Sequence, residues 1–173
     1  MKSICRELLQ LIYPEPRGCM LCQRPFRSPA NMDICQKCLD RIPFITEPSC
    51  KNCGKPLRGN VRKEFLCSSC KNGNSHFFER GISVALYEGA MRQWIIEFKY
   101  HGHVRLAQPL GFLMAMRFDM ERDFHIIEGV VPVPLSPRRE SERGFNQAHA
   151  LAKAICKVIK KPLLDSSLIR VRD

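Results

Sequence analysis

The 173-residue chain carries 28 Lys and Arg against 17 Asp and Glu, a formal net charge of +11, and 45% of its residues are hydrophobic. These values exclude a disordered chain and favour polyanionic partners such as nucleic acid, phosphorylated ligands or an anionic membrane surface. The excess is +7 in residues 1–80 (14 basic, 7 acidic) and +4 in residues 81–173 (14 basic, 10 acidic), so it is not confined to a tail.

The first sixteen residues predict a short amphipathic helix. Their apolar run is interrupted by Arg6, Glu7 and Gln10, and no small-residue cleavage site follows, so they do not resemble a secretion signal. No stretch of the chain approaches the roughly 20 apolar residues of a membrane span. We therefore expect a cytoplasmic protein whose ten cysteines are reduced thiols or metal ligands.

Residues 17–76 predict a double zinc ribbon, because eight cysteines form four CxxC pairs. The pairs are Cys19/Cys22, Cys35/Cys38, Cys50/Cys53 and Cys67/Cys70. Two such turns place four thiolates around one tetrahedral zinc ion. The segments CMLCQRPFR and CKNCGKPLR match across 31 residues, and CQKC and CSSC match across 32.

This repeat predicts two zinc ions, each held by the two pairs of one copy. A cross-braced arrangement, in which the first and third pairs share an ion, is the alternative. Both sites would be closed by four sulfur atoms and therefore structural. Basic residues of the second copy are candidates for contacts with a nucleic-acid backbone, although a solvated charged face explains them equally well. They are Lys51, Lys55 and Arg58, with Arg62 and Lys63.

From residue 77 onward the pattern predicts an α/β domain. Ile82, Val84 and Leu86 alternate with smaller residues as in a strand, and residues 91–98 carry apolar side chains at helical spacing. That apolar and aromatic stripe is interpreted as core and not as a base-stacking platform. Lys99 follows at the end of this helix and is a further candidate nucleic-acid contact. We expect helices over 104–121 and 146–160, a buried strand over 126–134, and an apolar run over 163–171 that begins another strand.

The segment VVPVPLSPRRESERGFNQAHALA, residues 130–152, predicts a strand, a basic loop and the start of a helix. Arginine forks and the free N–H groups of a helix N-terminus are both suited to phosphate oxygens. The candidate anion-binding residues are Arg138, Arg139, Arg143, Gly144, Asn146 and Gln147. On these residues alone, a solvated basic loop is the alternative.

Taken together, the double CxxC module, ALYEGAMRQWIIEFKYHG and VVPVPLSPRRESERGFNQAHALAKAI resemble the ComF family of competence-associated proteins. The resemblance covers almost the whole chain. It implies a double zinc ribbon followed by a phosphoribosyltransferase-like domain, a cytoplasmic location, and a role with single-stranded DNA and with competence or DNA-processing proteins. It also implies a fold built to bind phosphoribosyl pyrophosphate, in which residues 132–147 correspond to the pyrophosphate-side loop of the type I transferase fold.

One part of that fold is missing from the sequence. Type I transferases carry a later strand that ends in two acidic residues and a Thr/Gly-rich loop, and no such segment occurs here. We therefore expect an incomplete parallel sheet with flanking helices over residues 77–173, in a truncated product or fragment that does not bind phosphoribosyl pyrophosphate tightly. Two other functions stay open. One is a phosphoribosyltransferase that acts on a nucleobase or amine, and the other is a zinc-stabilised protein-interaction module without a ligand.

Overall fold

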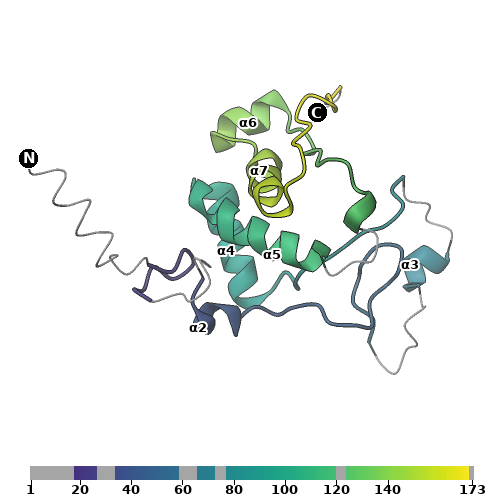
Figure 1. The fold of residues 1–173 in the computed structure, drawn as a ribbon, viewed down its shortest axis with the longest axis horizontal. Helices are drawn as coiled ribbons and strands as arrows, with labels where there is room; N and C mark the ends of the chain where they lie inside the picture. The colour runs from purple at the N-terminus through teal and green to yellow at the C-terminus, as the bar shows by residue number, and fades with distance from the viewer. Residues whose placement is uncertain (1–17, 27–33, 59–65, 73–76, 120–123, 172–173) are drawn as a thin grey trace, which may run out of the picture. The chain divides into compact units, whose positions relative to one another are not determined.

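The computed structural model describes residues 18–26, 34–58, 66–72, 77–119 and 124–171 (Figure 1). The chain divides into two compact units, Met1–Arg41 and Ile42–Asp173. The helix predicted over residues 1–16 lies outside the described residues, as do Arg62 and Lys63. Every helix in the described ranges is too short or too polar to traverse a lipid bilayer.

Each unit contains one small cysteine-bearing module made of a tight hairpin and a single helical turn. In the first unit the hairpin is joined by an antiparallel bridge between Gly18 and Pro25, and the helical turn is α2 (Gln36–Leu39). In the second unit an antiparallel bridge joins Ser49 and Pro56, and the helical turn is α3 (Ser68–Lys71). The repeat seen in the sequence is therefore a structural repeat.

The expected strand over residues 81–87 is a short extended segment with one antiparallel neighbour. Phe44 forms a bridge with Ala85. Hydrogen bonds flank it on both sides, from the Ile45 N–H to the Val84 carbonyl and from the Leu86 N–H to the Pro43 carbonyl, each 2.9 Å long. This pairing connects the segment before the second hairpin to the segment after α3.

Two of the predicted helices, α4 and α5, come next in the chain. Helix α4 (Gly89–Tyr100) buries Met91, Trp94 and Phe98 on one face, which confirms that its aromatic stripe is core. The chain then turns at Gly102, with φ +67°, and a 3-10 turn, η1 (Val104–Leu106), leads into α5 (Ala107–Asp119). Pro109 lies in the first turn of α5, where its missing N–H has no helical acceptor to bind.

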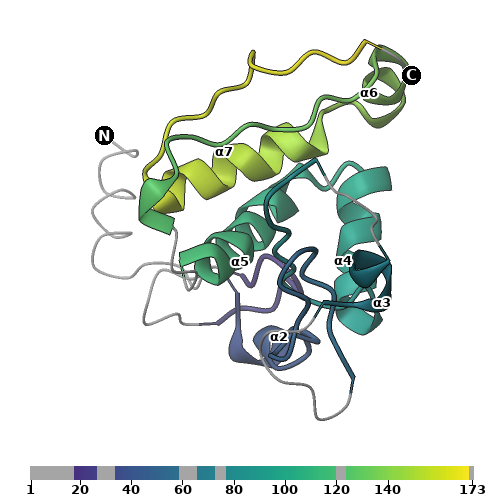
Figure 2. The ribbon, with the colours of Figure 1, turned by 90° about the vertical axis from the view of Figure 1, so that its right-hand side faces the viewer.

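Helices α5 and α7 (Gln147–Ile159) pack against each other and form the centre of the second unit (Figure 2). The two helices lie close together at Gly111, because a Cβ atom there would lie 2.6 Å from the Ala154 Cβ atom. Phe98 of α4 stacks at a tilt on Phe145, just before α7, with ring centroids 5.5 Å apart. The helices α5 and α7 thus pack together, and the Phe98 ring contact joins α4 to the residue just before α7.

The basic segment after Pro134 is a helix and not the loop that its charge suggested. Helix α6 (Pro137–Arg143) begins after Ser136, whose Oγ accepts a hydrogen bond from the Arg139 N–H, and Pro137 occupies its first position. It ends at Gly144, which has φ +76°. Ser followed by Pro at the start and Gly at the end are standard helix boundary signals. These residues therefore predict a helix here, although the charge of the segment suggested a loop.

The prediction of a buried strand over residues 126–134 is wrong, because much of this segment is exposed. Residues 124–126 form a 3-10 turn, η2 (Phe124–Ile126), and Val131 and Val133 are 38% and 66% exposed. Among the described residues only Val130 pairs, through a parallel bridge to Leu163. Pro132 and Pro134 have no N–H group to donate to a ladder, which limits pairing along this segment.

The apolar run from Leu163 pairs only at its first residue. Beyond Leu163, the described residues form no further bridge, and Ile169 and Val171 are 83% and 88% exposed. The bridge to Val130 has the parallel sense that we expected. A single bridge does not make a sheet, however, so the predicted parallel sheet remains a prediction.

Candidate metal centres

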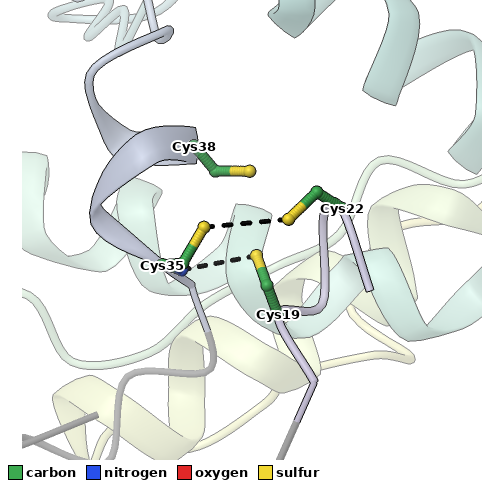
Figure 3. Close-up of side chains that lie close together, drawn as sticks. All are labelled: Cys19, Cys22, Cys35 and Cys38. Atoms are coloured by element: carbon green, nitrogen blue, oxygen red, sulfur yellow. Dashed lines mark hydrogen bonds between the residues drawn. The ribbon is translucent and has the colours of Figure 1, made fainter. Parts of the chain in front are cut away.

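The first cluster of thiols lies in the unit Met1–Arg41. Its sulfur atoms all lie within 4.8 Å of one another, and they belong to Cys19, Cys22, Cys35 and Cys38. The Sγ atoms of Cys22 and Cys35 are 3.7 Å apart, and the Cys35 N–H donates to Sγ of Cys19 at 3.3 Å. Figure 3 shows the four side chains converging from two segments, the hairpin and the single helical turn α2 with its N-cap residue.

Local backbone structure places these sulfur atoms. The Gln23 N–H donates to the Cys19 carbonyl at 2.6 Å, and the Cys19 N–H donates to the Arg24 carbonyl at 2.8 Å, which closes the hairpin around the first pair. Gln23 has φ +58°, a left-handed conformation that the turn requires. Cys35 is the N-cap residue of α2 and Cys38 lies on that helix, so one helical turn brings both sulfur atoms to the same side.

The second cluster repeats this geometry in the unit Ile42–Asp173. Its sulfur atoms also lie within 4.8 Å of one another, and they belong to Cys50, Cys53, Cys67 and Cys70. The Cys53 and Cys67 Sγ atoms are 3.7 Å apart, and the Cys67 N–H donates to Sγ of Cys50 at 3.3 Å. Gly54, with φ +71°, occupies the turn position that Gln23 holds in the first copy.

Both clusters fit a tetrahedral zinc ion. Four sulfur atoms at 2.3 Å from a central zinc are about 3.8 Å apart, which matches the 3.7 Å separation found in each cluster. Four thiolates fill the coordination sphere and leave no position for water or substrate, so such ions are structural. The donor sets therefore support two structural zinc ions, with each copy of the repeat closing its own site and no cross-bracing.

The pKa values of the thiols are shifted in both directions within each cluster. Burial opposes ionisation of Cys19, but neighbouring backbone N–H groups outweigh it and lower its pKa to about 7. The same balance lowers the pKa of Cys50 to about 6. Burial, reinforced by the neighbouring thiols, raises the pKa of Cys38 and raises that of Cys70 to about 12. Four thiolates this close repel one another, and a divalent cation is the charge that allows all of them to ionise.

The candidate nucleic-acid contacts of the second copy lie on its surface. Lys51, Lys55 and Arg58 are all exposed, and Lys51 lies inside the CxxC turn. Lys99 is exposed in the last turn of α4. The structure therefore leaves these cationic side chains accessible from solvent.

The six candidate anion-binding residues lie on α6, in the turn after it and at the start of α7 (Gln147–Ile159). Arg138 is 83% exposed on its side chain and pairs with Glu142 at 3.0 Å. Arg139 is exposed on the same helix, four residues before Arg143 and therefore on the same face as Arg143. Gly144 ends α6, and the Asn146 side chain accepts from the His149 N–H at 3.1 Å to cap α7.

Arg143 and Gln147 are the two members that the structure brings together. Arg143 Nη1 donates to Oε1 of Gln147 at 3.1 Å, and the Arg143 guanidinium carbon lies 5.2 Å from the centre of the Tyr100 ring. Gln147 is 5% exposed. The sequence reasoning did not identify Tyr100 or the capping role of Ser136. The Ser-Pro signal at the start of α6 predicts the Ser136 cap. No local pattern predicts the contact of Arg143 with Tyr100.

Comparison with known proteins finds a zinc ribbon family and proteins named for competence or DNA utilization. Residues 8–71 match the model of the double zinc ribbon domain family. The chain is 27% identical over 162 residues to competence protein ComFC of Bacillus subtilis, covering 84% of this chain and 65% of that protein. It is 23% identical over 146 residues to competence protein F of Haemophilus influenzae, covering 83% and 61%. It is also 26% identical over 143 residues to DNA utilization protein YhgH of Escherichia coli, covering 81% and 60%.

The chain thus spans between half and two thirds of the length of the curated relatives that it matches. No solved structure matches it. The sequence likeness runs from the zinc ribbon into the helical part of the second unit, since each of the three alignments covers more than four fifths of the chain.

Proposed function

We propose, from the assignment of this chain to the ComF family, that it takes part in DNA uptake as a zinc-held protein. The double zinc ribbon and the relatives named for competence and DNA utilization support that assignment. The action is proposed to take place in the cytoplasm, where thiols stay reduced and available to a metal. We retain the division into an N-terminal helix over 1–16, a double zinc ribbon over 17–76 and a transferase-like domain over 77–173.

The proposed partner is single-stranded DNA. The observation that supports it is a formal charge of +11 together with exposed cationic side chains on the second ribbon, Lys51, Lys55 and Arg58. A cationic surface that follows a phosphate backbone binds without sequence preference. Its affinity falls with added salt, because the counterions that binding releases from the strand then enter a more concentrated solution. Lys99 on α4 is proposed to extend this surface.

Fluorescence anisotropy with labelled oligothymidylate at several salt concentrations tests this proposal. The triple variant Lys51→Gln, Lys55→Gln, Arg58→Gln removes three proposed phosphate contacts. The slope of log affinity against log salt should then become less steep by about 2, since each contact to a single strand contributes about 0.7. The matched control removes three exposed charges from α7 and its end, Lys153→Gln, Lys157→Gln and Lys160→Gln, and should leave most of the slope unchanged.

A second candidate function is phosphoribosyl transfer to a nucleobase or amine. The order of elements supports it, because the extended segment at Val130, helices α6 and α7, and Leu163 in parallel to Val130 follow one another as in a strand, helix, strand unit. Titration calorimetry with phosphoribosyl pyrophosphate and Mg²⁺ tests it, with Arg138→Gln and Arg139→Gln expected to weaken any binding. A chain that binds neither oligonucleotide nor phosphoribosyl pyrophosphate contradicts both functions and leaves a zinc-held interaction module.

A further inference from the structure

Two segments of the second unit run antiparallel to each other, one leading into the second hairpin and one following α3. The bridge between Phe44 and Ala85 joins them at one end. A hydrogen bond of 2.7 Å from the Gly81 N–H to a carbonyl of the second hairpin joins them at the other end. We refer to residues 42–52 and 80–87 as the paired segments.

Two exposed aromatic rings belong to the first end of the paired segments. Phe44 is 45% exposed and Tyr87 is 57% exposed. Phe44 lies directly opposite Ala85, and residues opposed in this way share one face of the pair. Tyr87 comes two residues after Ala85, so the alternation of side chains along an extended segment predicts that its ring lies on the same face. Diagonal neighbours of this kind are about 7–8 Å apart, a spacing at which successive bases can stack on the two rings.

Cationic side chains gather at the hairpin end of the paired segments. A pocket of about 100 Å³ opens there, lined by residues of both segments and by Arg117 from the last turn of α5. The other cations on its lining are Lys51 and Arg80, and Glu47 is its single carboxylate, which gives three cations against one anion. Lysine and arginine side chains donate charge-assisted hydrogen bonds to phosphate oxygens, so this end of the paired segments favours a phosphate group.

We propose that single-stranded DNA lies along the paired segments. Bases stack on Phe44 and Tyr87 at one end, and backbone phosphates bind at the pocket of Lys51, Arg80 and Arg117 at the other. Single-strand sites without sequence preference combine stacking aromatic rings with cationic side chains, and here the same two segments carry both. This inference rests on the DNA binding proposed above, and it adds residues outside the second hairpin to that surface.

Fluorescence anisotropy with labelled oligothymidylate and the zinc-loaded chain tests the stacking. Phe44→Ala and Tyr87→Ala should each weaken binding by between about fivefold and a hundredfold. The slope of log affinity against log salt should stay the same, because neither change removes a charge. An abasic strand of equal length is the matched ligand. It keeps the phosphates and lacks the bases, so both variants should bind it like the unaltered chain.

Arg80→Gln tests the phosphate contact at the other end. It should make the salt slope less steep by about 0.7, whereas Lys153→Gln on α7 should leave the slope unchanged. Charge balance is the competing role for Arg80, because four thiolates and one Zn²⁺ ion in the second centre sum to a negative charge. Faster zinc release from Arg80→Gln to a chelator, with an unchanged salt slope, would overturn the phosphate contact.

Tyrosine ring NMR gives a readout on the unaltered chain. The ring signals of Tyr87, assigned with Tyr87→Phe, should shift on addition of oligothymidylate and stay in place with the abasic strand. If the unaltered chain does not bind oligothymidylate at low salt, the proposed function itself fails, and this inference fails with it. If the unaltered chain binds and both alanine variants bind equally well, the inference alone is overturned and the proposed function stands.

Discussion

Adding one methyl group at Gly54 should destabilise the second unit more than the same change at another left-handed glycine. Gly54 has φ +71°, and a Cβ atom there would lie 2.6 Å from the Gly81 carbonyl oxygen and 3.1 Å from the Ser83 backbone nitrogen. Both neighbours are backbone atoms, so neither can rotate away. Gly89 has φ +51° but no atom within 4 Å of its Cβ position. Gly89→Ala is therefore a control for conformation without the clash.

The expected losses in the free energy of unfolding follow from two effects, the left-handed backbone conformation and the steric clash. A left-handed conformation costs a non-glycine residue about 1 kcal/mol, and forcing an extra carbon into a packed site costs about 1–3 kcal/mol. We expect Gly54→Ala to lower the free energy of unfolding by about 2–4 kcal/mol and Gly89→Ala by about 1 kcal/mol. The clash lies directly beside Cys53, since the Cβ position of Gly81 is 2.8 Å from the Cys53 carbonyl oxygen. Gly54→Ala should also speed the release of zinc to a chelator.

Urea unfolding followed by tryptophan fluorescence measures the difference. The chain has a single tryptophan, Trp94, which is 6% exposed in α4 of the same unit as Gly54. With a slope of about 1–3 kcal/mol per molar urea, the midpoint should fall by about 1–2 M for Gly54→Ala and by about half a molar for Gly89→Ala. Equal midpoints for the two variants would refute the reasoning, because the contact with Gly81 would then contribute nothing.

Three further changes have expected outcomes. Gln23→Gly relieves a left-handed non-glycine residue, with φ +58°, and should stabilise the first centre by up to about 1 kcal/mol, seen as slower zinc release to a chelator. Gly111→Ala places a Cβ atom 2.6 Å from that of Ala154 and should cost about 1–3 kcal/mol in urea unfolding, part of which Ala154→Gly should restore. Burial raises the pKa of Cys156, so its thiolate fraction at pH 7 is small, and alkylation should be slower than that of a peptide thiol and rise with pH.

Each of these three predictions would be contradicted by a specific result. Faster zinc release from Gln23→Gly would mean that its side chain supports the turn. Additive effects in the double variant of Gly111 and Ala154 would mean that the two positions do not share the contact. Alkylation of Cys156 at the rate of a free peptide thiol, measured by mass spectrometry of the zinc-loaded chain, would contradict the effect of its partial burial.

The metal centres were predictable because their determinants are local. A CxxC pair fixes two sulfur atoms within one turn, and the matching spacing of the two copies indicates which pairs combine. One feature of the turn was less predictable, because Gln23 adopts the same left-handed conformation as Gly54 although only glycine adopts it readily. The helices were equally accessible, because the apolar spacing of α4 and α7 directly specifies the faces that become buried.

The candidate anion site was harder to predict because its geometry depends on non-local contacts. Three arginines within six residues suggested one cradle, yet α6 gives two of them different partners. Arg138 pairs with Glu142, while Arg143 contacts Tyr100, more than forty residues earlier in the chain. The burial of residues 126–134 failed for a related reason, since a strand is buried only where other segments cover it. Where a charged motif binds therefore depends on the helix that carries it, and here the hydrogen bond from Arg143 to Gln147 joins the end of α6 to the start of α7.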